Sequence, residues 1–308
     1  MKLRLACSIA LFATACKASI PDDGFLCGTG MPQCPPGMMC SAAGFCTTHA
    51  DAGVTPPDMS ATTIYGNGAL GDPSTMLAGK VGDLEFNTET GEVDLIVGGT
   101  TRTTIVGPML NGFAQLPQTN GPGVAIWSFS SLVIPPGVRV VPAGANFRVP
   151  VIESMTSLTL QGTISCLGFG GKGGGSGMPG RDIIGGPTPG GGGGATGADG
   201  SGGGGGGYAA AGSIGGGAMG GAPGMSFGED TLNPVNFGAG GGGGAGGLGK
   251  GGNGGNGGGA IALFGMTVEI DGLIDVSGAR GGNGVAGTPP MAVGGGGGGS
   301  GGSILIGG

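Results

Sequence analysis

The sequence predicts an all-β protein, organised as a short parallel β-helix-like solenoid from which long glycine-rich excursions extend. Three observations support this fold class. Short segments of alternating apolar and polar residues recur between Gly and Pro breakers. One strand signature occurs twice, on either side of a long glycine tract. No segment beyond the N-terminal leader has the apolar spacing of an amphipathic helix.

The composition limits both the core and the partners of this chain. The 85 glycines contribute no side chain, so a core can form only in the Val-, Ile- and Leu-rich segments that flank the tract. Charged residues make up 9% of the 308 residues, against about a quarter in typical globular proteins. The formal net charge is −7 and Lys and Arg do not cluster. A nucleic acid is therefore not an expected partner.

Residues 1–15 have the features of a signal peptide. Lys2 and Arg4 form a short basic region, and the apolar run that follows is too short to span a bilayer. The run ends in Ala-Thr-Ala before Cys16, which resembles a bacterial lipobox. That resemblance implies a lipid on Cys16 and an outer-membrane or cell-surface location. The alternatives are simple secretion to the extracellular space and an uncleaved N-terminal anchor.

Residues 16–46 are predicted to form a lipid tether followed by a small disulfide module. Four cysteines in so short an exported segment favour two disulfides, whereas the close Cys pairs of a zinc site are absent. We expect an interleaved pairing, first with third and second with fourth, but three connectivities are open. The Cys-Pro-x-Gly pattern resembles a module that follows the leader in bacterial surface lipoproteins. The cysteines are Cys27, Cys34, Cys40 and Cys46.

Residues 47–63 are polar and contain Pro, as expected of a linker, and they include His49, the single histidine of the chain. Residues 64–169 are predicted to be the first part of a β domain. Residues 84–97 alternate around a Thr-Glu-Thr-Gly turn and predict a hairpin. Further short strands are expected at residues 124–129, 132–134, 138–141, 147–152 and 158–166.

The repeated signature predicts how the domain is assembled. Residues 158–168 and 268–278 match at a constant offset (268 − 158 = 110), with Gly162 over Gly272. Each copy has one apolar face, so it must stack on another copy to bury that face. Residues 170–259 would then be an excursion between two stacked coils. Residues 260–308 would be the second part of the β domain, with a shorter excursion and a second matching re-entry (303 − 260 = 43).

Two conformations are compatible with the glycine tract. An ordered lattice of polyglycine-II helices would let neighbouring backbones bond to each other. The alternative is a flexible loop. Sparse Ser and charge, together with interspersed apolar residues such as Ile214, Met219 and Phe237, favour the lattice. With its leader and Cys-Pro module, the chain resembles glycine-rich, β-helix-type surface proteins of bacteria, a group without a settled activity.

The residues that could carry chemistry have simpler structural interpretations. Two carboxylate sets could act as acid and base, but a solvated outer strand face is the preferred interpretation. Trp127 and Phe129 share a strand face and could stack on a sugar ring, although core packing is preferred. No cofactor or metal is expected, since the Asn residues of the tract stand where a calcium repeat requires Asp. The two sets are Glu85, Glu89, Glu92 and Asp94, and Glu269, Asp271 and Asp275.

These observations predict an exported, non-enzymatic cell-envelope protein with a structural or adhesive role. Its expected partners are the membrane, through the lipid on Cys16, and extracellular matrix or polysaccharide. One alternative is a carbohydrate-binding or carbohydrate-degrading β-helix protein. Another is a glycine slab that binds ice or another surface.

Overall fold

The structure is a computed structural model that describes residues 39–40, 46–47, 68–108, 110–118, 121–144, 148–175, 177–178, 191–196, 200–228, 235–246, 249–287 and 292–308. The chain divides into two compact units, Met1–Pro56 and Pro57–Gly308. In the first unit β1 (Met39–Cys40) pairs antiparallel with β2 (Cys46–Thr47), which sets the backbone of Cys40 opposite that of Cys46. The leader, Cys16, Cys27, Cys34 and the linker lie outside the described residues, as do the side chains that would form the disulfides.

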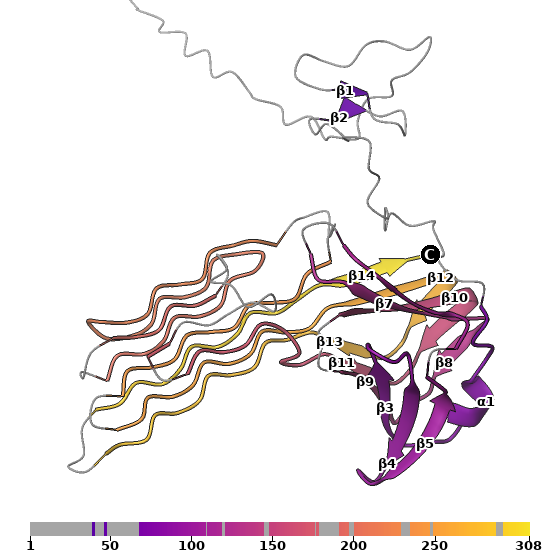
Figure 1. The fold of residues 1–308 in the computed structure, drawn as a ribbon, viewed down its shortest axis with the longest axis horizontal. Coiled ribbons are helices and arrows are strands. Elements are labelled where there is room, and N and C mark those ends of the chain that lie inside the picture. The colour runs from indigo at the N-terminus through magenta and orange to yellow at the C-terminus, as the bar shows by residue number, and fades with distance from the viewer. Residues whose placement is uncertain are drawn as a thin grey trace, which may run out of the picture. The chain divides into compact units, whose positions relative to one another are not determined.

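The described part of the second unit is nearly all β, with twelve strands in two mostly parallel sheets and one four-residue helix, α1 (Ser74–Leu77) (Figure 1). This confirms the all-β prediction. The first sheet has the order β14-β12-β10-β7-β6, with β8 beside β10, and the second has the order β13-β11-β9-β3-β4-β5. The first sheet comprises β6 (Phe113–Leu116), β7 (Val124–Phe129), β8 (Leu132–Ile134), β10 (Val149–Leu160), β12 (Ile261–Ile270) and β14 (Ile304–Gly307). The second comprises β3 (Gly82–Asn87), β4 (Val93–Val97), β5 (Thr101–Val106), β9 (Val138–Ala143), β11 (Thr163–Ser165) and β13 (Leu273–Asp275).

The predicted hairpin is confirmed, since β3 and β4 pair antiparallel with Glu85 opposite Asp94. The strand boundaries differ further along the chain. Residues predicted as two strands at 147–152 and 158–166 instead form the long strand β10 and the short strand β11. The pairing of β10 with β12 changes register between Ser154 and Ser157. One strand can therefore continue through a segment that appears to be a break in the sequence pattern.

The predicted pairing of the two copies of the signature is confirmed. Leu158 pairs with Val268 along β10 and β12, and Ile164 pairs with Ile274 along β11 and β13, at the expected offset of 110 residues. The glycine bends lie over each other, because a Cβ on Gly272 would lie 2.0 Å from the carbonyl oxygen of Gly162. The second offset is confirmed as well, since Ile261 pairs with Ile304.

The main apolar core takes side chains from both sheets. Its largest members are fully buried, and Cys166 lies in it. Burial decreases in the second copy of the signature. Leu158 and Leu160 of β10 are fully buried, whereas Ile270 is 36% exposed and Leu273 is 60% exposed. The core thus centres on the first copy and is less completely covered at β12 and β13.

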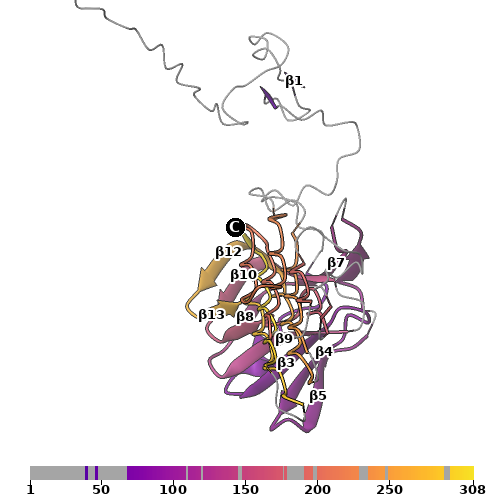
Figure 2. The same cartoon turned by 90° about the vertical axis from the view of Figure 1, so that its left-hand side faces the viewer.

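The glycine-rich excursions run side by side and bond to one another through their backbones (Figures 1 and 2). We call this body the glycine slab; it comprises residues 170–178, 191–196, 200–228, 235–246, 249–259, 276–287 and 292–303, where described. Its hydrogen bonds recur at every third residue. The nitrogens of Gly171, Gly174 and Gly177 donate to the carbonyls of Gly238, Gly241 and Gly244 at 2.8, 2.9 and 2.9 Å.

The close approach of these segments explains why they are made of glycine. A Cβ on Gly241 would lie 2.2 Å from the carbonyl oxygen of Gly297, and one on Gly203 would lie 2.0 Å from that of Gly242. Real Cβ atoms essentially never come within 3.0 Å of such an atom. Because the neighbour is backbone, no side-chain rotation can relieve the clash.

Candidate binding surface on the glycine slab

Side chains on the slab surface follow the same three-residue repeat as the hydrogen bonds. In segment 249–259, Lys250, Asn253 and Asn256 are exposed, while most of the glycines between them are buried. A backbone with three residues per turn points every third side chain in the same direction. Segment 276–287 follows the same rule, with exposed side chains at Ser277, Arg280 and Asn283.

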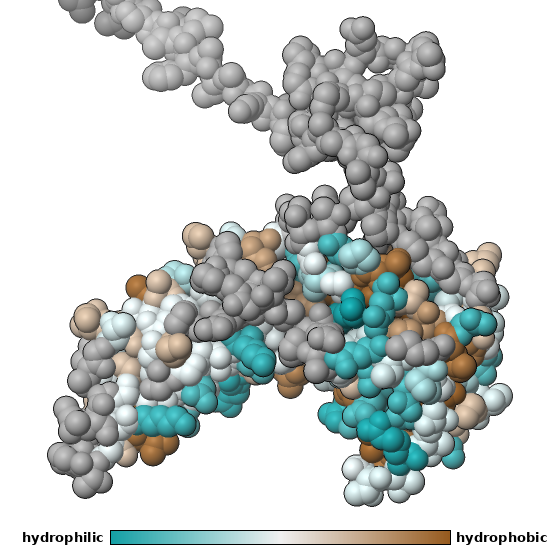
Figure 3. Space-filling model, in the orientation of Figure 1, coloured by the Kyte–Doolittle hydropathy of each residue, from teal (hydrophilic) through white to brown (hydrophobic). Residues whose placement is uncertain are grey.

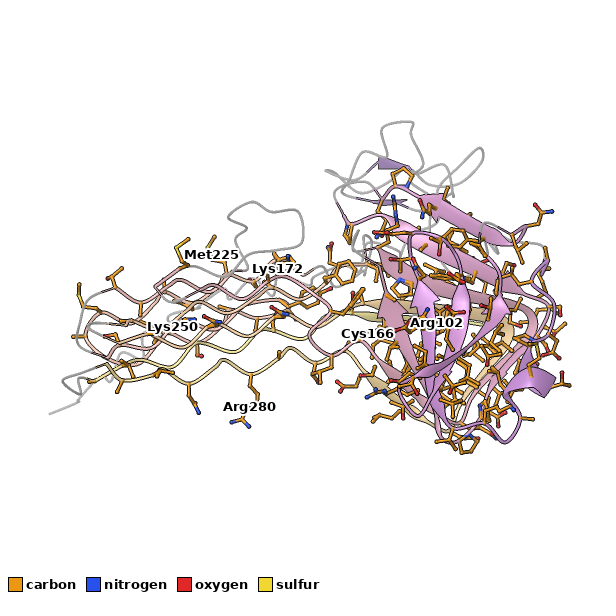
Figure 4. The ribbon with its side chains drawn as sticks, turned by 60° about the horizontal axis from the view of Figure 1, so that its bottom comes forward. Arg102, Cys166, Lys172, Met225, Lys250 and Arg280 are labelled. Carbon is orange, nitrogen blue, oxygen red and sulfur yellow. The ribbon has the colours of Figure 1, made fainter. Side chains whose placement is uncertain are left out.

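These rows belong to neighbouring segments. Segment 249–259 bonds on one side to segment 170–175, where Gly254 donates to Gly174 at 2.8 Å. On the other side it bonds to segment 276–287, where Gly282 donates to Asn253 at 2.7 Å. Lys172, Lys250 and Arg280 accordingly lie on three adjacent segments, and Lys250 lies further along the slab than the other two (Figure 4). We call this surface the polar edge; it consists of Lys172, Lys250, Asn253, Asn256, Arg280 and Asn283.

The charges of the polar edge all have one sign. None of its three cations forms an ion pair with a described residue. The described residues of the slab include no Asp or Glu. One amide has a structural role, since the Oδ1 atom of Asn256 accepts a hydrogen bond of 3.0 Å from the nitrogen of Gly173. The edge is therefore a fixed row of cations and amides on a backbone of hydrogen-bonded glycine.

A second set of exposed side chains on the slab is apolar. Ile214 is 72% exposed, Met225 is 62% exposed and Met219 is also exposed. Their segments are bonded antiparallel, with Gly212 donating to Gly224 at 2.8 Å. In Figure 3 most of the described slab surface is white, with separate tan, brown and teal patches on it.

The carboxylates of the hairpin differ from the prediction. Glu85 and Asp94 both form ion pairs with Arg102, and the hydroxyl of Thr104 donates to Asp94 at 2.7 Å. Asp94 is 2% exposed, so the interpretation of a solvated outer face is wrong for this residue. Arg102 on the next strand, β5, provides the positive charge that pairs with these two carboxylates. The sequence pattern of the two hairpin strands does not include this residue.

Other carboxylates of the domain pair with different groups or are exposed. A two-point hydrogen bond from Arg139 holds the pKa of Asp83 below its usual value. On β13, the hydroxyl and the backbone nitrogen of Ser277 lower the pKa of Asp275. Glu269 and Asp271 are exposed. Among the described residues, no group of three or more His, Cys, Asp or Glu side chains is placed to hold a metal ion.

The sugar-stacking hypothesis for Trp127 and Phe129 is wrong, because both rings are fully buried. Trp127 packs against Phe86 and Phe113 at centroid distances of 5.0 and 5.2 Å, and its Nε1 donates to the carbonyl of Gly91 at 2.8 Å. The whole of β7 is buried, since its other face is covered by apolar residues that include Val235 and Phe237 of slab segment 235–246.

Cys166 has no exposed surface through which to react. Burial raises its pKa to about 12, with a further contribution from the charge of Asp275. The thiol is therefore neutral at physiological pH and acts as a small apolar side chain.

Comparisons with known proteins found no match. No protein family, curated protein or solved structure matches the chain. Among the described residues, no helix is long and apolar enough to cross a membrane. The polar edge is the feature that the sequence interpretation missed. Its signal was present in Gly-Lys-Gly-Gly-Asn-Gly-Gly-Asn, where polar residues recur at every third position from Lys250 to Asn256.

Proposed function

We propose that this chain is an exported, non-enzymatic protein of the cell envelope with a structural or adhesive role. The proposal takes the export leader and the lipobox-like Cys16 from the sequence. It takes the glycine slab from the structure, and this is the observation that carries it. A body held together by backbone hydrogen bonds, with few charges and with side chains mainly on its surface, is suited to present a surface rather than to enclose a substrate.

We also propose a finer description of the fold. The two sheets form a short parallel β-helix-like solenoid, in which each copy of the signature is one coil and a glycine bend turns the corner. The parallel registers of β10 with β12 and of β11 with β13 support this winding. The slab is a polyglycine-II lattice. Its support is the three-residue recurrence of hydrogen bonds between segments that lie far apart in the sequence.

The structural role follows from how such a lattice resists deformation. Segment 235–246 alone donates to three neighbours, with bonds from Gly238 to Gly258, from Gly242 to Gly204 and from Gly243 to Met178. Each bond adds only about 1 kcal/mol, but many of them act together across contacts that only glycine permits. The slab would therefore keep its exposed side chains at fixed spacings, which is what an adhesive surface requires.

Export and lipidation can be tested by labelling cells with a radioactive fatty acid and fractionating them. The wild-type chain should carry the label in the membrane fraction, and Cys16→Ala should lose it. Cys7→Ala is the matched control, because this cysteine lies within the leader and should leave labelling unchanged. Equal labelling of wild type and Cys16→Ala would remove the lipid anchor from the proposal.

The adhesive role needs a separate assay. Cells that display the chain should attach to extracellular matrix or polysaccharide more strongly than cells that lack it. Cells that display a variant of the chain without the slab segments should attach no more strongly than cells that lack the chain. Attachment that does not depend on the slab would contradict an adhesive role for it.

A further inference from the structure

The polar edge differs in charge from the rest of the protein. The chain has a formal net charge of −7, yet Lys172, Lys250 and Arg280 stand on described slab residues that contain no carboxylate. All three side chains are exposed, and none pairs with a described acid. An exposed cation that pairs with no described acid is available to bind an anion from outside.

The acid that precedes Arg280 most closely in the sequence, Asp275, is too distant to neutralise it. Asp275 precedes Arg280 by five residues, which corresponds to about 15 Å along an extended threefold backbone. At physiological salt, exposed charges are largely screened beyond about 8 Å. The side chain of Asp275 is also engaged locally, since it accepts a hydrogen bond of 2.9 Å from the nitrogen of Ser277.

The spacing of the polar edge suits a long ligand with a regular repeat. Successive side chains in one row are three residues apart, or about 9 Å, so Lys250, Asn253 and Asn256 span about 19 Å. Each row carries a single cation, Lys250 in one and Arg280 in the other, and the amides beside it can both donate to and accept from hydroxyl groups. A single exposed cation contributes little, but neighbouring rows held at fixed spacings can bind several repeats of one polymer at once.

From these observations we propose that the polar edge binds linear anionic polysaccharides. Lys172, Lys250 and Arg280 would pair with the acidic groups of the polymer, and Asn253 and Asn283 would bond to its hydroxyls. A single-stranded nucleic acid is a poorer fit, because none of the six residues of the edge is aromatic and no base could stack there. The inference rests on the proposed adhesive role and names the class of ligand for it.

The test measures binding of the purified full chain to polygalacturonate, with neutral dextran and phosphatidylglycerol vesicles as comparisons. The triple variant Lys172→Gln, Lys250→Gln, Arg280→Gln should bind polygalacturonate about tenfold more weakly, and Lys250→Gln alone about twofold more weakly. Lys80→Gln is the matched control. It removes the same charge from an exposed position near β3 and should leave binding unchanged. Binding of the wild type should also weaken as the salt concentration rises.

Several outcomes would overturn the inference: full binding by the triple variant, an equal loss with Lys80→Gln, or equal binding of neutral dextran. Binding to vesicles without binding to polygalacturonate would replace the ligand with an anionic membrane. As a control for folding, the unfolding temperature of each variant is measured and should equal that of the wild type. This assay uses purified protein, whereas the test of the proposed function measures the attachment of cells. A failure to bind polygalacturonate would therefore not contradict cell attachment, and a failure of cell attachment would not contradict binding to polygalacturonate.

Discussion

Gly241→Ala should destabilise the slab far more than an alanine at a surface glycine. The added Cβ would lie 2.2 Å from the carbonyl oxygen of Gly297, which is backbone and cannot rotate away. The segments must separate by about an ångström, which strains the packing and weakens the bond from Gly241 to the carbonyl of Gly255, now 2.9 Å long. Overpacking and one weakened hydrogen bond together cost about 2–4 kcal/mol.

The matched control is Gly298→Ala. A Cβ at this position would find its nearest atom at 3.7 Å, which is ordinary contact. Alanine there should be neutral, or more stable by about 0.5 kcal/mol because it restricts the unfolded chain. In a thermal unfolding experiment, Gly241→Ala should lower the Tm by roughly 5–15 °C relative to Gly298→Ala. Equal unfolding temperatures would refute the close packing of segment 235–246 against segment 292–303.

Three further predictions concern the β-sheet part of the chain. Trp127→Ala should cost about 3–5 kcal/mol, because it empties a fully buried site and removes the donor to the carbonyl of Gly91; urea unfolding measures this, and an unchanged midpoint would contradict the burial. Cys166 should resist a thiol reagent at neutral pH in the folded chain and react once guanidinium unfolds it, since burial raises its pKa to about 12; rapid reaction of the folded chain at this residue would show that the site is open. Asp83 has a folded pKa below its unfolded value because Arg139 donates to it, so its contribution is present above the unfolded pKa and is lost as the pH falls through the folded pKa. Arg139→Gln should therefore lower the stability by a constant amount above the unfolded pKa of Asp83, and this loss should shrink as the pH falls through the acid range; an effect of equal size at all pH values would argue against this linkage.

The sequence was sufficient to predict the pairing of the two signature copies. Leu158, Ile164 and their counterparts place apolar side chains and a glycine bend at matching positions, and burial of that face requires the copies to stack. A pattern of side chains specifies a register whenever one face is buried. The hairpin and the re-entry of the chain at Ile261 could be predicted for the same reason.

The arrangement of the slab could not be predicted in this way. Glycine has no side chain, so a run such as residues 202–207 gives no signal for which neighbour each residue will bond to. The burial of Trp127 was also uncertain in sequence, since it depends on Phe86 and Phe113, whose rings pack against it from other strands. The burial of the Asp94 carboxylate depends likewise on its ion pair with Arg102, which lies on a strand outside the predicted hairpin. In each case the deciding residue comes from a segment that local pattern does not relate to the site.

Residue-resolved amide hydrogen exchange over residues 294–302 tests the three-residue lattice most directly. The nitrogens of Gly294, Gly296, Gly297, Gly299, Ser300 and Gly302 each donate to a neighbouring segment. Those of Gly295, Gly298 and Gly301 are exposed and donate to no described residue. The lattice predicts slow exchange at the six residues whose nitrogens donate. It predicts fast exchange at Gly295, Gly298 and Gly301, which recur at every third position. Uniformly fast exchange across the segment would instead identify a flexible loop and contradict the slab.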